Sequence, residues 1–333
     1  MNILVGDIGG TKTALGMYES TTTGGYKTIA ERVYVSHDHA SLSAVLGCFL
    51  PTAGSARQID AAVFSVAGPV QNGVCSTTNL PWVISEHELT NLLGSPVALI
   101  NDFHAVALGV NELPSKSLRV LQSGARDPKG AYAVIGAGTG LGEAIALPLE
   151  NGTVRVLASE GGHADFAPRT EIEWKLMQYL SSLHSHVSVE RVVSGMGLPD
   201  LYDFVVKAGL EKEDPETRRR FANESQGAVI SERAGQDPAA ARALSLFVSA
   251  YGAEAGNLAL KVMPAGGLYI AGGIAARLVD QLDWQEFLRS FSDKGRMHPL
   301  LASFPVFVVR DANVGLLGAR AHAALLWRSR TLH

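Results

Sequence analysis

Two glycine-rich turns are the segments of this chain best suited to chemistry, and each follows a short apolar run. Residues 3–13 read ILVGDIGGTKT, and residues 133–142 read AVIGAGTGLG. Glycine has no Cβ and accepts positive φ, so backbone N–H groups in such turns can close on an anion. The threonine in each turn, Thr11 or Thr139, adds a hydroxyl donor. Either turn alone could be a structural β-turn, but their repetition favours phosphate binding and predicts an enzyme that uses ATP.

Other common active-site motifs are absent from the sequence. It contains no G-x-x-x-x-G-K-[ST], and the second turn does not fit G-x-G-x-x-G, so a P-loop enzyme and a dinucleotide-binding fold are disfavoured. It contains neither G-x-S-x-G nor H-E-x-x-H, which removes the common serine-hydrolase and zinc-protease interpretations.

Asp7 lies inside the first turn, at the end of the first apolar run. It could close an Asx-turn onto its own backbone. It could instead hold Mg²⁺ through a water molecule beside the phosphates, because Mg²⁺ keeps several waters and needs only one or two carboxylates. We favour the second interpretation.

Asn101 and Asp102 follow the apolar run 96–100 (PVALI). Both residue types are good helix N-caps, and both stand where functional residues of open α/β sheets often lie, past the carboxyl end of a buried strand. As a catalytic base, Asp102 would accept the proton of a substrate hydroxyl while Asn101 orients that substrate. Capping and chemistry are compatible here, and the sequence alone does not separate them.

A third cluster, residues 159–165 (SEGGHAD), places Glu160 and His163 on either side of two glycines. The glycines predict a sharp turn that points both side chains one way. Glu accepts hydrogen bonds from paired hydroxyls and His donates or accepts, so the pair suits a polyol. The alternative is a surface loop that holds a Glu and a His by chance. Glu190 is less distinctive and would ordinarily be a solvated helix residue or half of an ion pair.

Composition narrows the class of protein. The chain has 333 residues, enough for two domains, and is 47% apolar and 18% charged. Its formal net charge is −4 and it has no basic stripe, so we expect no nucleic-acid partner. Two cysteines exclude a disulfide framework and a cysteine zinc site. No stretch reaches the roughly 18 apolar residues of a membrane span, and the first residues do not fit a signal peptide, so we expect a cytoplasmic protein without a membrane partner.

Apolar patterning predicts one structural plan that occurs twice. Strands are expected at 2–7, 12–18, 61–66, 96–100 and 267–274, a second strand–turn–strand unit at 131–147, and helices from about 102, through most of 170–262 (most clearly 238–263) and at 313–328. The polar stretch 111–130 marks a boundary, and the last helix is expected to pack back on the first domain. We therefore predict an α/β fold with a small α/β domain, 1–112 plus about 313–333, and a large α/β domain, 113–312.

Taken together, these segments resemble the bacterial ATP-dependent glucokinase family, within the actin-like ATPase and sugar-kinase superfamily, over nearly the whole chain. The two turns resemble the phosphate-binding segments of that superfamily, and residues 270–274 (IAGGI) resemble its adenosine segment. Residues 67–70 (AGPV), 79–82 (NLPW) and 101–103 (NDF) resemble glucokinase signatures in the sugar cleft, the Glu160–His163 turn and the Glu190 segment resemble its ligands for sugar hydroxyls, and residues 311–318 (DANVGLLG) resemble its closing segment.

The resemblance implies two actin-like (ribonuclease H-like) α/β domains flanking a cleft, and transfer of the γ-phosphoryl group of Mg-ATP to the 6-hydroxyl of D-glucose, the first step of glycolysis. It also implies a homodimer. Asp102 would be the base, and the sugar would be held by Asn79, Asn101, Asp102, Glu160, His163 and Glu190. The nucleotide would be held by Gly6, Asp7, Ile8, Gly9, Gly10, Thr11, Gly138, Thr139, Gly272 and Gly273, with Asp7 acting on Mg²⁺ through water.

Departures from related families and several alternatives qualify this resemblance. Sugar kinases of the repressor/open-reading-frame/kinase (ROK) group carry a cysteine-rich zinc motif and, in some members, a DNA-binding extension, and this sequence contains neither. Lys12 stands where proteobacterial glucokinases often have Asn. A kinase for mannose or an N-acetylated amino sugar, a sugar-binding regulator with little turnover, and an actin-like or chaperone-type ATPase are the alternatives. ADP or polyphosphate could replace ATP as the donor.

Overall fold

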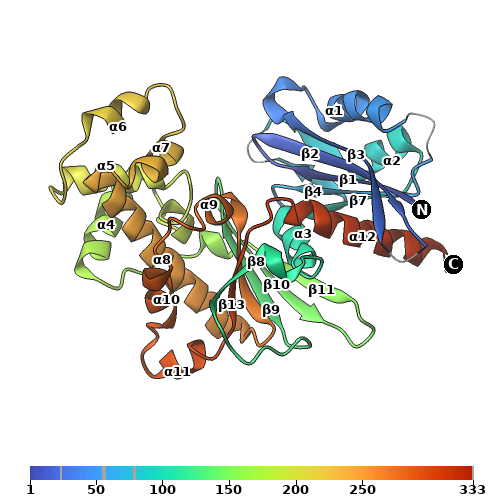
Figure 1. The fold of residues 1–333 in the computed structure, drawn as a ribbon. Coiled ribbons are helices and arrows are strands. Elements are labelled where there is room, and N and C mark those ends of the chain that lie inside the picture. The colour runs from blue at the N-terminus through green and yellow to red at the C-terminus, as the bar shows by residue number, and fades with distance from the viewer. Residues whose placement is uncertain (23–24, 55–57, 78–79, 332–333) are drawn as a thin grey trace. The chain divides into compact units, whose positions relative to one another are not determined.

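The computed structural model describes residues 1–22, 25–54, 58–77 and 80–331 (Figure 1). The chain forms two compact units. Unit 1 comprises Met1–Pro114 together with Asn313–His333, and unit 2 comprises Ser115–Ala312. Each unit contains one main β-sheet covered by helices.

Unit 1 is built on a five-stranded sheet in the order β3-β2-β1-β4-β7. Its strands are β1 (Asn2–Ile8), β2 (Lys12–Ser20), β3 (Tyr26–Val35), β4 (Ala61–Val66) and β7 (Val97–Asn101), and a small hairpin is formed by β5 (Val74–Ser76) and β6 (Val83–Ser85). The first three strands are antiparallel, whereas β4 and β7 run parallel to β1. Its helices are α1 (Leu42–Phe49), α2 (Glu86–Leu93), α3 (Asp102–Gly109) and α12 (Val314–Thr331).

Alternating side chains of β1 enter two different cores of unit 1. Leu4 and Ile8 pack with the apolar side of α1, and Ile3 and Val5 pack with α12 on the other face of the sheet. Successive side chains of a strand point to opposite faces of the sheet. A strand covered on both faces therefore needs apolar residues at nearly every position. Helix α12 therefore packs on the sheet formed by the first part of the chain.

Helices α3 and α12 approach each other closely through glycine. A Cβ at Gly318 would overlap the carbonyl oxygen of Ala105, and a Cβ at Gly109 would overlap that of Val314. The absence of side chains at these two positions lets the helix backbones touch. The contact holds α3, which starts at Asp102, against α12.

Unit 2 repeats the plan on a six-stranded sheet in the order β11-β10-β9-β12-β13-β8. Its strands are β8 (Leu118–Gln122), β9 (Tyr132–Ala137), β10 (Leu141–Pro148), β11 (Val154–Ser159), β12 (Gly267–Ala271) and β13 (Val306–Val309). Three antiparallel strands are again followed by two that run parallel to the first. The expected second copy is confirmed, and β8 adds an antiparallel edge strand in a stretch that the sequence indicated to be irregular.

The helices of unit 2 surround a large apolar core. They are α4 (Glu171–Ser181), α5 (Leu198–Lys207), α6 (Pro215–Arg220), α7 (Gln226–Arg233), α8 (Pro238–Val262), α9 (Gly272–Arg277), α10 (Trp284–Ser292) and α11 (His298–Leu301). The central one, α8, packs against α5, α7 and α10 (Figure 1). It starts at the N-cap Asp237, which accepts the Ala239 N–H at 2.8 Å, as the sequence pattern predicted to within a residue. No helix in the described ranges is long and apolar enough to cross a membrane.

Candidate active site

In unit 1, three parallel strands bring the expected site residues to one edge of the sheet. The register pairs Asp7 of β1 with Ser65 of β4, and one residue further on it aligns Ile8, Val66 and Asn101. The carboxyl ends of β1, β4 and β7 therefore lie side by side. The first glycine turn and the Asn101–Asp102 pair emerge from this edge, as expected for a site in an α/β sheet.

The side chain of Asp7 lies between the Ser65 hydroxyl and the start of α12. The Ser65 hydroxyl donates to Asp7 Oδ1 at 3.1 Å, and a Cβ added to Gly315 of α12 would lie 3.0 Å from Oδ2. Burial raises the pKa of Asp7, and the hydrogen bond from Ser65 only partly opposes this rise. The protein's own groups thus leave the charge of this carboxylate incompletely compensated, which suits a nearby cation.

The described residues contain no group of three or more His, Cys, Asp or Glu placed to hold a metal ion. A metal bound mainly by protein side chains is therefore not indicated within these ranges. One carboxylate beside phosphates is compatible with Mg²⁺, which retains several of its waters. Asp7 fits that requirement.

Asn101 and Asp102 form the start of α3. Asn101 Oδ1 accepts the N–H groups of Phe103 at 2.9 Å and His104 at 3.3 Å, and Asn101 Nδ2 donates to the Gly68 carbonyl at 3.3 Å. Asp102 Oδ1 also accepts from Phe103 N–H, at 2.9 Å. The structure thus shows the capping role for Asn101. The bond to Gly68 uses one of the two N–H donors of the amide.

Sequence reasoning gave no role to Cys75, which contacts the same edge. Gly68 has φ +143°, and a Cβ there would lie 3.2 Å from the Cys75 sulfur. Burial and the charge of Asp102 both raise the pKa of the Cys75 thiol. No motif indicates this residue, because its place depends on the β5–β6 hairpin. Asn79, expected to bind sugar, lies outside the described residues.

The first glycine turn is a tight hairpin between β1 and β2. The Gly9 N–H donates to the Lys12 carbonyl at 2.9 Å, and the Ser36 hydroxyl donates to the Gly9 carbonyl at 2.9 Å. The Gly9 amide is therefore engaged within the turn, whereas the side chains of Thr11 and Lys12 are exposed. Gly6 lies within β1, where a Cβ would come within 2.9 Å of three apolar side chains, so packing alone accounts for this glycine.

The second glycine turn carries a carboxylate that the sequence did not connect to it. Glu190 Oε2 accepts the Leu141 N–H at 2.8 Å, and a Cβ at Gly140 would overlap the same carboxyl. The turn closes through a bond from the Gly138 N–H to the Gly140 carbonyl, at 2.8 Å. No heavy atom outside the turn lies within 4 Å of a Cβ built on Gly138, so this glycine borders open space.

Glu190 also reaches the Glu160–His163 turn. Its Oε1 lies 4.0 Å from His163 Nδ1, and its side chain is 19% exposed, against 62% for His163. Residues Gly161–His163 form one turn of 3-10 helix that follows Glu160, so the predicted sharp turn is confirmed. Glu190 is a half-buried residue of the short 3-10 helix Val189–Arg191. Of the two ordinary roles that the sequence left open, a solvated helix residue and half of an ion pair, its place beside His163 fits the second.

The expected adenosine segment lies at the end of β12. Gly272 has φ +86°, and a Cβ there would lie 2.5 Å from the Ala137 carbonyl oxygen, at the end of β9. Gly273 follows in the first turn of α9 and has nothing within 4 Å of a built Cβ. Gly272 is thus required by the fold, whereas Gly273 borders open space.

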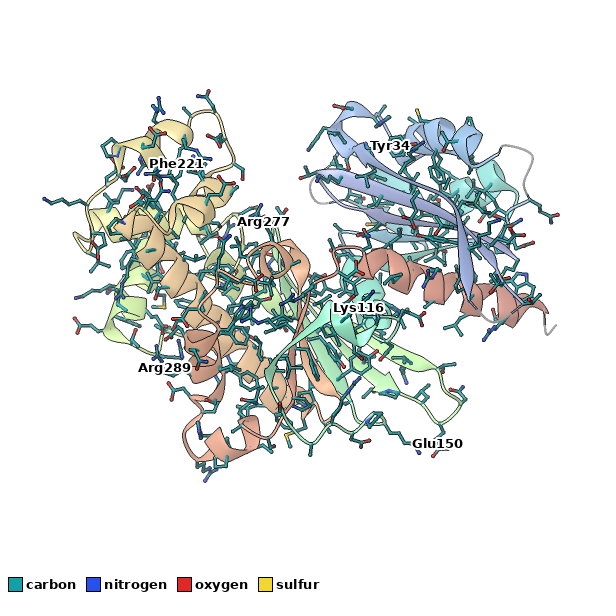
Figure 2. The ribbon with its side chains drawn as sticks, viewed as in Figure 1. Tyr34, Lys116, Glu150, Phe221, Arg277 and Arg289 are labelled. Carbon is teal, nitrogen blue, oxygen red and sulfur yellow. The ribbon has the colours of Figure 1, made fainter. Side chains whose placement is uncertain are left out.

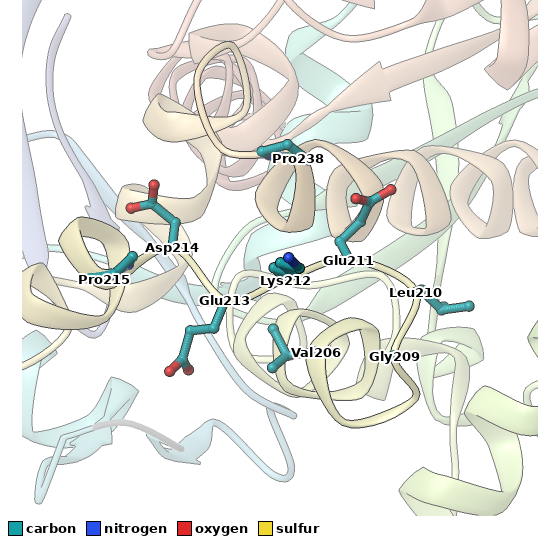
Figure 3. A pocket seen from close by; sticks show the side chains of 9 residues that line it. All are labelled: Val206, Gly209, Leu210, Glu211, Lys212, Glu213, Asp214, Pro215 and Pro238. Carbon is teal, nitrogen blue, oxygen red and sulfur yellow. The ribbon is translucent and has the colours of Figure 1, made fainter.

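A hollow of about 780 Å³ lies elsewhere in unit 2, along the segment that joins α5 to α6 (Figure 3). Charged and apolar residues of positions 209–215, with Val206 and Pro238, line it. It shares no residue with the site described above and has no part in it.

The fold and this site define the class of protein. The two sheets share the order of five strands, with a glycine turn between β1 and β2 in one and between β9 and β10 in the other, and this is the plan of the actin-like ATPases. A family model described as Glucokinase matches residues 4–326. The chain belongs to this glucokinase family, whose members are ATP-dependent hexose kinases.

Individual relatives agree with this assignment. The glucokinase of Nostoc sp. is 44% identical over 340 residues, covering 97% of this chain and 99% of the relative. The glucokinase of Colwellia psychrerythraea is 36% identical, covering 96% of this chain and 95% of the relative. The crystal structure of a glucokinase from an Antarctic psychrotroph superposes with a TM-score of 0.81 at 32% identity, over 97% of this chain and 98% of that one.

A more distant neighbour shares the fold alone. It is a ROK family glucokinase from Streptomyces griseus, solved in complex with glucose and AMPPNP, with a TM-score of 0.65 and 20% identity over 98% of this chain and 100% of that one. The expected family, the actin-like α/β fold class and the expected enzyme class are confirmed.

Proposed function

We propose that this chain transfers the γ-phosphoryl group of Mg-ATP to the 6-hydroxyl of glucose. One observation carries the proposal, namely that Glu190 joins the second glycine turn to the Glu160–His163 turn. Its carboxylate accepts an N–H of the second glycine turn and lies 4.0 Å from His163. This arrangement supports a reaction in which a phosphate and a polyol are held by neighbouring groups.

The proposed sugar ligands are the residues that the resemblance implies. In unit 2, Glu160 and Glu190 would accept hydrogen bonds from ring hydroxyls, and His163 would donate or accept. In unit 1, the Asn101 amide would donate its second N–H to the sugar, and Asn79 is proposed on the resemblance alone. A site built to hydrogen-bond several hydroxyls discriminates strongly against sugars that lack one, because buried polar groups are then left unpaired.

Asp102 is the proposed base. It would accept the proton of the 6-hydroxyl while that oxygen attacks the γ-phosphorus. It is the first residue of α3, so the helix holds its backbone in place. The bond from Phe103 N–H fixes one carboxylate oxygen. Phosphoryl transfer depends mainly on such positioning and on electrostatic stabilisation.

The nucleotide would be held by the two glycine turns and by the Gly272–Gly273 segment. The first turn would contribute Gly6 to Thr11, of which Gly6 and Ile8 are buried in β1 and Thr11 is exposed. The second would contribute Gly138, which borders open space, and Thr139, which is exposed. When Mg²⁺ is bound, it neutralises charge on the phosphates. Asp7 would hold that ion through water, with Ser65 orienting the carboxylate.

A coupled assay for sugar 6-phosphate, run with ATP and Mg²⁺ on glucose, mannose, fructose and N-acetylglucosamine, tests the substrate. We expect kcat/KM for glucose to exceed that for each other sugar by at least tenfold. Preference for another hexose would change the proposed substrate and leave the proposed mechanism unchanged. Binding of ATP with no sugar phosphorylated would reject the proposal. Repeating the glucose assay with ADP or polyphosphate identifies the donor.

Asp102→Asn tests the base. The variant retains an oxygen to accept from Phe103 N–H, so the start of α3 should persist, but it cannot take up a proton. We expect kcat to fall on the order of 10²-fold or more with little change in glucose binding, the usual effect of losing a general base. Asp283→Asn is the matched control, because Asp283 caps α10 by accepting the N–H groups of Gln285 and Glu286. Near-normal turnover of Asp102→Asn would remove Asp102 from this role.

The homodimer implied by the resemblance and the cytoplasmic location expected from the composition stay predictions. Light scattering of the purified protein would test the first, and fractionation of cells would test the second.

A further inference from the structure

Glu143 is a buried carboxyl to which the proposed reaction gives no role. It lies on β10, two residues after Leu141, and is only 2% exposed. Within the described residues its Oε1 is buried and has no hydrogen-bond partner. A lone carboxyl in such a position is costly unless it is neutral or serves a purpose.

The carboxyl of Glu143 supports the turn that carries the proposed sugar ligands. A Cβ at Gly161 would overlap Glu143 Oε2, so this oxygen occupies the space beside Gly161. The next glycine, Gly162, packs in the same manner on the carbonyl of Leu141. Residues of β10 therefore lie directly behind the backbone between Glu160 and His163. A movement of the Glu143 carboxyl would displace this turn.

The charge on Glu143 is set by burial and by α8. Burial and the charge of Glu254 raise the pKa of Glu143 to about 7, and Lys261 opposes the rise. Glu254 accepts from Asn257 Nδ2 at 2.9 Å, and Asn257 in turn accepts from Lys294 Nζ at 2.7 Å.

The groups that face Glu143 come from the elements packed around it. The titratable ones are Glu254, Lys261 and Tyr251, all on α8. The neighbouring strands β9 and β11 pair with it through Ile135 and Ser159, and the 3-10 turn presents Gly161. Ionisation would place a second buried negative charge near Glu254, where the strand neighbours offer no cation to receive it.

We propose that Glu143 is a positioning residue, whose protonated carboxyl holds the Glu160–His163 turn in the form that binds sugar and whose ionisation releases it. The inference rests on the proposed function of that turn. It makes sugar affinity depend on pH through a residue that does not touch the sugar. The chemical step at Asp102 is unaffected.

The test is the pH dependence of KM for glucose and of kcat at saturating glucose. In the natural protein, KM should rise about tenfold between about pH 6 and pH 8, as expected when only the protonated form binds and the pKa is about 7. Glu143→Gln keeps the shape and cannot ionise, so KM should stay low across this range. Its kcat profile should match that of the natural protein.

Two further variants separate positioning from a general loss of structure. Glu143→Ala removes the support at every pH, so KM should be raised throughout while Glu143→Gln remains normal. Glu150→Gln is the matched control, an exposed glutamate in the loop between β10 and β11 (Figure 2) that should keep the natural pH dependence. The inference is wrong if Glu143→Gln retains the rise in KM, or if the natural protein shows none. Absence of any glucose turnover would instead contradict the proposed function.

Discussion

The glycines of the proposed nucleotide-binding segments differ in their surroundings. Some are required by the packing of the fold, and others border open space. Gly272 has positive φ and abuts the Ala137 carbonyl, so the fold requires it. Gly138 has neither constraint, since a Cβ there would meet nothing within 4 Å. At Gly138, which lies in a turn proposed to bind phosphate, this open space leaves room for ligand atoms close to the backbone.

Gly138→Ala should therefore impair nucleotide binding without loss of stability. We expect KM for ATP to rise about tenfold, equivalent to roughly 1.4 kcal/mol, because the methyl group would intrude on the phosphates. The melting temperature should stay within about a degree of the natural value. Initial rates against ATP concentration and a thermal melt measure the two effects.

Two comparison variants complete this experiment. Gly272→Ala should lower the stability by about 1–3 kcal/mol because it forces an L-residue into positive φ against a backbone oxygen. Gly235→Ala, at another open position away from both turns, should leave KM for ATP and stability unchanged. An unaltered KM in Gly138→Ala would argue that the phosphates do not approach this turn.

At the scale of elements, the α3–α12 contact connects two parts of the proposed site within unit 1. Helix α3 begins at Asp102, and the first turn of α12 brings Gly315 to Asp7. The two helices meet through Gly318 and Gly109, where a Cβ would overlap a backbone carbonyl of the other helix. Because packed helices transmit a displacement as rigid elements, a change at Gly318 should reach both aspartates.

Gly318→Ala tests this connection. The added methyl group would overlap the Ala105 carbonyl, so we expect a loss of about 1–3 kcal/mol in the free energy of unfolding, together with a lower kcat. Urea unfolding and steady-state rates measure the two effects.

Gly47→Ala is the control, since Gly47 is exposed within α1 and has nothing within 4 Å of a built Cβ. There alanine should raise stability by up to about 1 kcal/mol through its better helix propensity. Equal stabilities of the two variants would show that the helices can move apart at no cost.

At the scale of the molecule, the parts predicted well from sequence are those whose pattern is local. Strand β4 is buried at every position and reads as an apolar run interrupted only by Ser65, and α8 is a long segment rich in Ala and Leu that begins at an Asp–Pro pair. Strands β3 and β8 were not predicted, because they lie at sheet edges and expose residues such as Val33 and Val120, which leaves no clear period.

In the candidate site, too, only the local features could be predicted from the sequence. The glycine turns and the sharp Glu160–His163 turn follow from local chemistry and were predicted. The bond from Leu141 N–H to Glu190 joins residues 49 positions apart, and the packing of Glu143 on Gly161 depends on the pairing of β10 with β11. Such contacts are products of tertiary structure, so no spacing in the sequence indicates them.

Unit 1 is formed by two separate segments of the chain, and this affects the order in which it can fold during synthesis. The chain emerges from the ribosome N-terminus first, so β1 to β7 appear before α12. The sheet face formed by Ile3 and Val5 is covered only when α12 has been translated. Unit 2 is one continuous segment and can fold as soon as it emerges. The first-made sheet is thus completed last, and until then its exposed apolar face is the part of the nascent chain that a chaperone would recognise.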